Sequence, residues 1–357
     1  MEWLAALCLL GLPAGFLLVW RVPLCRASQA SGHEAVSLVI PARNEERNLP
    51  RLLGSIRAAD CQPAEVIVVD DASTDATATV AQTHGATVLL SHPLPLGWTG
   101  KNWSCFQGAE NANADVLIFL DADTWFSPNG YQRLADAYFA AGDGIVAVSI
   151  LPYHVVQRSY EELSLFFNLL MAMGAGGFGW IGVPRLFGQS MIISRDLYNA
   201  SGGHSAVSNS ILENLALSSR MTRAGGRCVC YGGRGVLNVR MFPQGLSQLC
   251  EGWAKAFASG AAASGLAILA ISTLWLTALC ACFLAILMAP EIWRMRFAVI
   301  YCVLALQLLY FARQIGNFSA ITCLFYPLPL LFYFGLFAHS LYCKLFKRPV
   351  SWRGRTI

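Results

Sequence analysis

Charged residues are unevenly distributed along this chain, and that distribution limits the folds it can adopt. Acidic residues concentrate between Glu34 and Glu251, whereas the segment after Trp253 contains a single carboxylate, Glu291. Charged residues make up only 13% of the sequence and hydrophobic residues 55%, against about 25% charged residues in a soluble domain. We therefore expect a water-soluble body followed by an apolar tail that faces lipid.

The N-terminal apolar segment runs from Trp3 to Trp20 and is followed by Arg21 and Arg26. It is just long enough to cross a hydrocarbon core of ~30 Å, so we expect residues 1–21 to form a transmembrane anchor. A cleaved signal peptide is the alternative, although the segment lacks a basic start and a small-residue cleavage site. Because basic residues favour the cytoplasmic side, the domain that follows is expected to be cytoplasmic.

Three further apolar runs follow the body, at 266–288, 297–311 and 320–343. The first and last are long enough to span a bilayer, and the middle one spans only if flanking residues extend it. We predict C-terminal membrane helices within 264–345 and a basic tail at 346–357. The chain is thus expected to be a multi-pass protein of the cell membrane.

The number of C-terminal crossings stays open. With a cytoplasmic domain and three complete crossings, the basic tail would lie outside, against the tendency of Lys and Arg to stay inside. Pro327 and Pro329 lie inside the last run and are expected to break it, because proline removes a backbone donor. A re-entrant hairpin that returns to the cytoplasmic side would resolve the conflict.

The body, predicted at 34–255, has the pattern of an α/β domain. Short β-branched runs alternate with helix-length segments, as expected for a parallel sheet covered on both faces. The predicted strands are 36–40, 66–69, 87–90 and 116–120.

One apolar stretch, 163–181, lies inside this body. Its second half is rich in glycine, which argues against a spanning helix. The two interpretations left open are packing in the core and an interfacial segment at the entry of a lipid acceptor.

The net charge of +4 is modest. The basic residues lie beside apolar runs and form no arginine-rich stripe. A membrane surface is therefore the expected partner, and nucleic acid is not.

The strongest chemical signal is the pair Asp121 and Asp123, directly after the strand 116–120. Two carboxylates one residue apart at a strand end point the same way along the pleat and create a negative field. A hard divalent ion such as Mg or Mn, held by one or two carboxylates, typically completes its shell with diphosphate oxygens. The pair therefore predicts a metal site for a diphosphate ligand.

A second signal, Asp70 and Asp71, follows the strand 66–69. Open parallel sheets place ligands at this end of their strands, where the two carboxylates can bind the ribose or base of a nucleotide. For Ser73 and Asp75, in the same segment, capping of the next helix is the alternative.

A third signal is the polar turn with Pro41, Asn44 and Glu45 at the end of the first strand. Together the three segments resemble the pattern of inverting family 2 glycosyltransferases, and further motifs resemble the carotenoid-acid glucosyltransferases of that family. The resemblance covers nearly the whole chain, and its motifs are Gly97–Lys101, Pro152–His154, Gly202–His204, Ile211–Glu213, Arg240–Met241, Glu251–Lys255 and Arg313–Ser319.

The resemblance implies a GT-A fold, a UDP-sugar donor, a Mg or Mn ion and inversion at the anomeric carbon. It implies a hexose, glucose, transferred to the carboxylate of an apolar C30 carotenoid acid, giving a glycosyl ester. Hopanoid-associated transferases are more distant relatives with the same layout. The alternative function is transfer to another lipid: a polyprenyl phosphate, a hopanoid or a glycerolipid. A polysaccharide synthase or exporter subunit usually needs more spanning helices, and the intact carboxylate pairs argue against an inactive glycan-binding relative.

The resemblance also assigns roles to individual donor-site residues. Asp71 with Asp70 would hold the uridine, in the donor site that includes Pro41, Asn44 and Glu45. Lys101 would bind a phosphate as a point charge, with a solvated surface lysine as the alternative.

For the acceptor, the resemblance suggests Trp253 and Lys255, which stand where many relatives carry a Gln-x-x-Arg-Trp signature. A Trp at the membrane interface is the alternative for Trp253. His154 and His204 are further acceptor candidates, with structural hydrogen bonding as the alternative.

The chain departs from its relatives at Glu213 and Asn214. Relatives often carry a second acid there, which serves as the general base. Asn cannot accept that proton, so either Glu213 takes this catalytic role or the acceptor needs no base.

Overall fold

The computed structural model describes residues 1–25, 35–142, 144–210, 212–260, 265–346, 351–352 and 355–356. The chain forms two compact units, each built from separate stretches of sequence. The sheet unit contains Pro23–Tyr153 and Pro184–Arg240. The helical unit contains Met1–Val22, His154–Val183 and Met241–Ile357.

These units differ from the contiguous domains expected at 1–21, 34–255, 264–345 and 346–357. The difference arises because two stretches of the expected body, 154–183 and 241–255, join the helical unit. Glu34 and much of the basic tail lie outside the described residues.

The sheet unit is built on a seven-stranded sheet with the order β3-β2-β1-β4-β8-β6-β9. The four strands expected from the sequence are confirmed. Its strands are β1 Val36–Ala42, β2 Glu65–Asp70, β3 Thr87–Leu90, β4 Val116–Leu120, β6 Val146–Leu151, β8 Ser190–Ser194 and β9 Arg227–Gly232.

The expectation of an all-parallel sheet is wrong for one strand. β3, β2, β1 and β4 run parallel, and β6 runs parallel to β9. β8 runs antiparallel to both β4 and β6. Only the four parallel strands were predicted from the sequence, so the mixed character of the sheet was not.

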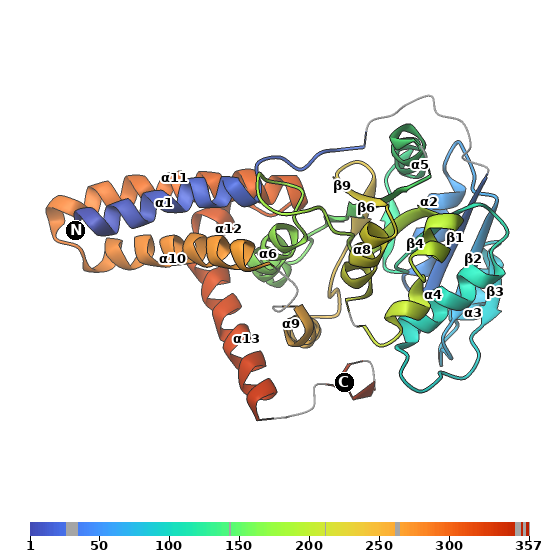
Figure 1. Ribbon diagram of the computed structural model, residues 1–357. Coiled ribbons are helices and arrows are strands. Elements are labelled where there is room, and N and C mark those ends of the chain that lie inside the picture. Colours follow the sequence, from blue (N-terminus) through green and yellow to red (C-terminus); the bar gives the residue numbers. More distant parts are fainter. Residues whose placement is uncertain are drawn as a thin grey trace. The chain divides into compact units, whose positions relative to one another are not determined.

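Helices cover both faces of this sheet (Figure 1). Alternate residues of β1 show the reason. Leu38 and Ile40 pack with α2 (Leu49–Arg57) and α5 (Gly130–Ala141), whereas Val39 packs with α4 (Gly100–Asn111) and α8 (Glu213–Arg223). A strand buried on both sides must be apolar at successive positions. The helices of the unit are α2 Leu49–Arg57, α3 Thr77–Thr83, α4 Gly100–Asn111, α5 Gly130–Ala141, α7 Arg195–Ala200, η3 His204–Val207 and α8 Glu213–Arg223.

A small sheet accompanies the large one. β5 (Thr124–Phe126) pairs antiparallel with β10 (Leu237–Val239). β7 (Tyr153–His154) is also in this small sheet and lies at the boundary of the two units. β5 begins directly after Asp123, so this pairing fixes the chain that follows Asp121 and Asp123.

The helical unit contains two helices that are long and apolar enough to cross a membrane, among the residues that the structure describes. α10 (Leu266–Met288) has a mean hydropathy of 2.2 and coincides with the predicted run. α11 (Glu291–Ile315) has a mean hydropathy of 1.8 and extends the marginal run 297–311 at both ends. Glu291 is the first residue of α11, where the positive end of the helix dipole stabilises its carboxylate.

The other apolar segments form shorter helices. α1 covers Glu2–Leu18 and ends because Val19 adopts an extended backbone. The last predicted run is divided into α12 (Ala320–Leu324) and α13 (Pro327–Leu345). The predicted break thus lies just before Pro327, which begins a helix at a position that tolerates proline.

The stretch 163–181 is largely part of the core of the helical unit. η2 (Ser159–Ser164) leads into α6 (Leu165–Ala175), most of whose residues are buried. This outcome favours the packing interpretation over the interfacial one. The remaining elements of the unit are α9 Leu246–Gly260, β11 Ser351–Trp352 and β12 Arg355–Thr356.

α1, α10 and α11 pack side by side (Figure 1) around a buried amide. The Gln307 side chain donates to the Leu12 carbonyl over 2.7 Å and accepts from Trp275 Nε1 over 3.2 Å. Gly15 permits this approach, since a Cβ there would lie 2.8 Å from Gln307 and 2.9 Å from Trp275. We call Gln307, Trp275 and Leu12 the helix clamp, because they join three helices through hydrogen bonds.

Candidate active site

The carboxyl ends of β2, β1 and β4 meet at one edge of the sheet, which we call the catalytic edge. β1 pairs in parallel with β2 on one side and with β4 on the other. In this register Ala42 lies opposite Asp70, and Asp121 follows the last residue of β4. Open α/β sheets bind ligands at such an edge.

A lysine and two carboxylates form the centre of the site. The Lys101 ammonium lies 2.7 Å from Asp121 Oδ1 and 2.8 Å from Glu213 Oε1. It also donates to the Gly188 carbonyl over 2.7 Å. Burial alone would lower the pKa of Lys101, but the two carboxylates raise it above its ordinary value. The ammonium therefore stays charged across the physiological range.

Three elements far apart in sequence supply these groups. Lys101 lies in the first turn of α4, whose N-cap Thr99 accepts from the Asn102 amide. Asp121 lies in the turn after β4, where its amide donates to Gln189 and its carbonyl accepts from Thr124. Glu213 begins α8, and its side chain is only 5% exposed.

Asn214, beside Glu213 on α8, has a structural task. It is buried, and its Nδ2 donates to the carbonyl of Phe187. That bond fixes the segment whose next residue, Gly188, accepts from Lys101. The Asn214 side chain thus helps to hold the carbonyl that binds Lys101.

The donor set suits a divalent cation at Asp121 and Asp123. Asp123 lies half buried in the same turn as Asp121. The carboxylates of Asp121 and Glu213 already hold one positive charge, that of Lys101. Within the described ranges, no three His, Cys, Asp or Glu side chains are close enough to form a complete protein site. An Mg or Mn ion would therefore take oxygens from a diphosphate or water as well.

Hydrogen bonds join the loops after β1 and β2, which carry two of the sequence motifs. Asn44 Oδ1 accepts from the Thr74 amide over 2.8 Å, and the Asn44 amide donates to Ser73. The Glu45 amide donates to Thr77 over 2.8 Å. Asn44 has a φ of 56°, a left-handed conformation that Asn tolerates better than most residues. Pro41, half buried in β1, precedes this turn.

Asp70 and Asp71 are both buried but have different contacts. Asp70 accepts from the amide and hydroxyl of Ser73 and so shapes its own loop. The Asp71 carboxylate lies 3.6 Å from the Arg43 guanidinium, which also donates to the Asp71 carbonyl over 2.9 Å. Asp75 contacts Thr77 in the first turn of α3, which agrees with the capping alternative for that residue.

His204 is a buried neutral histidine. Its Nδ1 lies 2.9 Å from the Tyr198 hydroxyl, and its ring packs against Phe119 at 4.7 Å. Burial, with a smaller contribution from the charge of Lys101, lowers the pKa of His204 to about 3. These contacts are structural hydrogen bonding and packing, the alternative left open for this residue.

The other acceptor candidates belong to the helical unit. His154 is buried, and burial lowers its pKa to about 4. Trp253 is also buried: it stacks on Phe167 and donates from Nε1 to Ser164 over 3.0 Å. The side chain of Lys255 lies outside the described residues. Acceptor binding by these residues stays a prediction.

Two parts of the site were not expected from the sequence. Arg43 contacts Asp71, and the segment of Phe187 and Gly188 holds Asn214 and Lys101 through its carbonyls. The position of Arg43 inside the first motif was an available signal. The contacts made by the carbonyls of Phe187 and Gly188 gave no sequence signal, because every residue has a backbone carbonyl.

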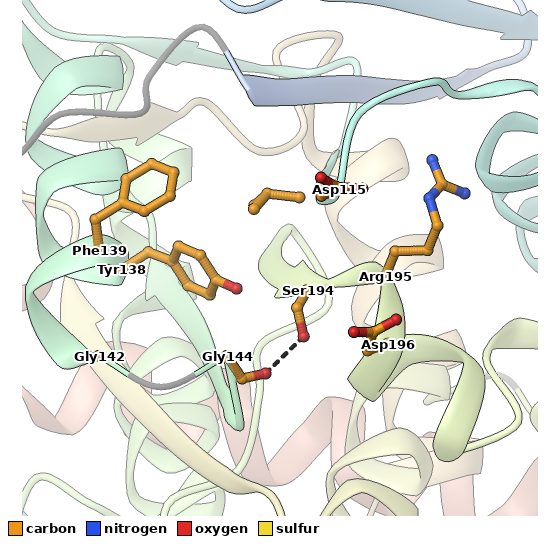
Figure 2. A pocket seen from close by; sticks show the side chains of 9 residues that line it. Asp115, Tyr138, Phe139, Gly142, Gly144, Ser194, Arg195 and Asp196 are labelled. Carbon is orange, nitrogen blue, oxygen red and sulfur yellow. Dashed lines mark hydrogen bonds between the residues drawn. The ribbon is translucent and has the colours of Figure 1, made fainter.

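A separate cavity of about 350 Å³ lies at the opposite end of β4 (Figure 2). Asp115, Tyr138, Ser194 and Arg195 are among the residues that line it. Arg195 donates to the carbonyls of Ala109, Ala112 and Ala114, so its charge serves the fold. This cavity is not part of the catalytic edge.

Comparison with known proteins agrees with this geometry. Residues 37–215 match the family described as "Glycosyl transferase family 2". The chain is 32% identical over 333 residues to the 4,4'-diaponeurosporenoate glycosyltransferase of Staphylococcus aureus strain MRSA252, covering 90% of this chain and 88% of the relative. The protein of the same name from strain NCTC 8325 / PS 47 matches with the same identity and coverage.

A solved structure shows the same fold. It is the mannosyltransferase PcManGT from Pyrobaculum calidifontis, in complex with GDP-Man and Mn²⁺. The match has a TM-score of 0.57 and 17% identity and covers 97% of this chain and 99% of that one. The central sheet, the catalytic edge and both comparisons agree, and this chain is a glycosyltransferase that belongs to glycosyl transferase family 2.

Proposed function

We propose that this enzyme transfers glucose from a UDP-sugar to the carboxylate of a C30 carotenoid acid, with inversion, to form a glycosyl ester. The observation that supports it most is the similarity to proteins named 4,4'-diaponeurosporenoate glycosyltransferase, which extends over nine-tenths of the chain. That name describes a carotenoid carboxylate as the substrate of the relative. The departure at Asn214 is consistent with the same acceptor chemistry.

The catalytic edge would bind the donor in two parts. Asp71 and Asp70 would hold the uridine, in a loop shaped by Asn44 and Glu45. Asp121 and Asp123 would hold Mg or Mn, which stabilises the charge that develops on the diphosphate as it leaves. Lys101, at the start of α4, would donate to the same diphosphate.

The chemistry proposed for the acceptor needs no general base. A carboxyl group with a pKa near that of Glu, about 4.3, is ionised at neutral pH. Its oxygen can displace UDP from the anomeric carbon directly: one carbon–oxygen bond forms, the bond to the diphosphate breaks, and no proton moves. Glu213, ion-paired with Lys101, would then orient the lysine and would not abstract a proton.

The acceptor is apolar, so we place the reaction at the cytoplasmic face of a cell membrane in a multi-pass protein. The two apolar helices α10 and α11 support association with a membrane by length and composition. The cytoplasmic side is proposed from Arg21 and Arg26, because basic residues favour that side. Trp253, Lys255, His154 and His204 remain the acceptor candidates. Because Trp253 and His204 are buried and hydrogen-bonded, their contribution would be to position neighbouring groups.

The proposal is tested by incubating membranes that contain the enzyme with labelled UDP-glucose and a panel of acceptors, followed by mass analysis. The panel contains the carotenoid acid, a polyprenyl phosphate, a hopanoid and a glycerolipid. Label on the carotenoid acid alone supports the proposal. Label on another lipid in preference to the acid would replace the acceptor and leave the family assignment intact.

A further inference from the structure

Three oxygens surround the ammonium of Lys101. Asp121 Oδ1 and Glu213 Oε1 are ion-pair partners at 2.7 Å and 2.8 Å, and the ammonium donates to the Gly188 carbonyl over 2.7 Å. In the donor-free protein these contacts hold the ammonium in place, and two carboxylates balance its charge before any phosphate binds.

This arrangement has an electrostatic reason. Asp121 and Glu213 both contact the same ammonium, and the Glu213 side chain is almost completely buried. Two carboxylates so close together repel each other unless a cation lies between them. Lys101 is that cation, attached to the protein.

The carboxylate of Asp121 has two competing partners, Lys101 and the proposed divalent ion. Asp121 is a proposed ligand of Mg or Mn, and its Oδ1 already contacts Lys101. A divalent ion at this carboxylate would lie close to the ammonium, and the two positive charges would repel each other. Metal binding is therefore opposed while Lys101 stays in place.

A nucleoside diphosphate offers Lys101 new partners. The lysine lies in the first turn of the twelve-residue helix α4, where backbone amides and the helix dipole also favour an anion. A shift of the flexible side chain towards the diphosphate would free Asp121. Each ligand would then favour the binding of the other, by the same factor in both directions.

We propose that Lys101 is a built-in cation that holds Asp121 and Glu213 until a divalent ion and a nucleoside diphosphate replace it together, so that the two ligands bind cooperatively. This inference rests on the proposed use of a divalent ion and a UDP-sugar. It adds that Lys101 couples the binding of the metal ion to the binding of the nucleotide.

The test measures Mn²⁺ binding to the purified full-length protein with and without saturating UDP, by electron paramagnetic resonance of free Mn²⁺. The wild-type protein should bind Mn²⁺ at least ~10-fold more tightly when UDP is present, within the usual range of coupling between sites. Lys101→Met should bind Mn²⁺ at least ~10-fold more tightly than wild type without UDP, and UDP should then improve binding by less than ~3-fold.

Two control variants separate this effect from a general change of charge. Lys101→Arg keeps the cation and should keep the weak metal binding of the UDP-free protein. Arg223→Met removes one positive charge at the exposed last residue of α8, the helix that begins at Glu213. It should leave UDP-free Mn²⁺ affinity within ~3-fold of wild type, because a helix rises ~1.5 Å per residue and an exposed charge farther away than ~10 Å is largely screened. Thermal unfolding checks that each variant is folded.

The inference is overturned if Lys101→Met binds Mn²⁺ no more tightly than wild type without UDP. It is also overturned if UDP improves Mn²⁺ binding equally in both, or if Lys101→Arg behaves like Lys101→Met. The assay contains no acceptor and no turnover. A wrong acceptor assignment would therefore leave its outcome unchanged, and its failure would leave the transfer assay unaffected.

Discussion

At the scale of single residues, Glu213 and Asn214 show how neighbouring polar side chains divide their tasks. Glu213 faces Lys101, whereas Asn214 donates backwards to the Phe187 carbonyl. An Asp at position 214 would lose that donor and place a carboxylate against a carbonyl oxygen. The structure thus gives a reason for Asn at this position besides the chemistry of the acceptor.

We predict that Glu213→Gln keeps activity towards a carotenoid acid within about tenfold of wild type and that Asn214→Asp does not raise it, because a positioned base contributes ~10² to 10⁴ in rate only where a proton must move. Rates are compared from about pH 5.5 to about pH 8, where an ionised acceptor gives a flat profile. A loss of about three orders of magnitude with normal donor affinity, or a rising limb in the profile, would make Glu213 the base.

Asp123→Ala should lower transfer by at least about 10²-fold, since loss of a metal ligand removes the charge that stabilises the leaving diphosphate. Asp121→Ala should be nearly as severe. Asp115→Ala is the matched control, because Asp115 immediately precedes β4 at its other end (Figure 2) and should have little effect. Near-normal turnover of Asp123→Ala in chelator-treated membranes would contradict the metal assignment.

The neutral state of His204 predicts a dependence of stability on pH. The unfolded chain binds a proton at a pKa of about 6.5, whereas folded His204 binds one only near its pKa of about 3. The free energy of unfolding should therefore fall as pH decreases through this interval, by at most about 1.4 kcal/mol per pH unit for this residue.

His204→Asn keeps a polar partner for Tyr198 and removes the titrating group. Its thermal unfolding temperature should fall less steeply than that of wild type as pH decreases from neutrality. Parallel slopes for the two proteins would show that His204 is not responsible.

The residue motifs could be predicted from sequence, and their mutual contacts could not. Asp70, Asp71 and Asp121 were identified because they follow recognisable strands. Lys101 was identified from its motif but was expected to point to a phosphate. Its contacts with Asp121 and Glu213 depend on the packing of α4 and α8 on one face of the sheet, which is a property of the folded chain.

At the scale of elements, the accuracy of the predicted boundaries follows from the strength of the local signal. The four parallel strands were predicted because each contains a short run of β-branched and other apolar residues. α11 was underestimated because its first turns contain Glu291, Arg294 and Arg296, which lower the local hydropathy although they are compatible with a helix. β8 was missed because its place in the sheet depends on pairing with β4 and β6, which are distant in sequence.

The helix clamp allows a prediction about the packing of α1. Gly15→Leu should destabilise the helical unit by ~1–3 kcal/mol, because the new side chain would overlap Gln307 and Trp275. Gly335→Leu on α13 is the matched control, since the space around Gly335 is open within 4 Å. The measurement is the thermal unfolding temperature of the detergent-solubilised protein. Equal effects of the two substitutions would show that α1 does not pack on the clamp.

At the scale of the whole molecule, the sequence motifs predicted the family of the chain. The glycosyltransferase family is confirmed by the match over residues 37–215 and by the relatives from Staphylococcus aureus. The exact composition of the two units could not be predicted, because 154–183 and 241–255 join the helices through tertiary contacts. Trp253, for example, is buried there against Phe167.

The central claim is transfer of glucose to an ionised lipid carboxylate. The most direct measurement gives purified enzyme, UDP-glucose and Mn²⁺ either a carotenoid acid or the matching carotenoid alcohol, and identifies the products by mass spectrometry before and after mild alkaline hydrolysis. We predict a glucosyl product from the acid alone, with release of glucose by alkali, as expected of an ester. Equal or preferred glucosylation of the alcohol, with an alkali-stable product, would contradict the account.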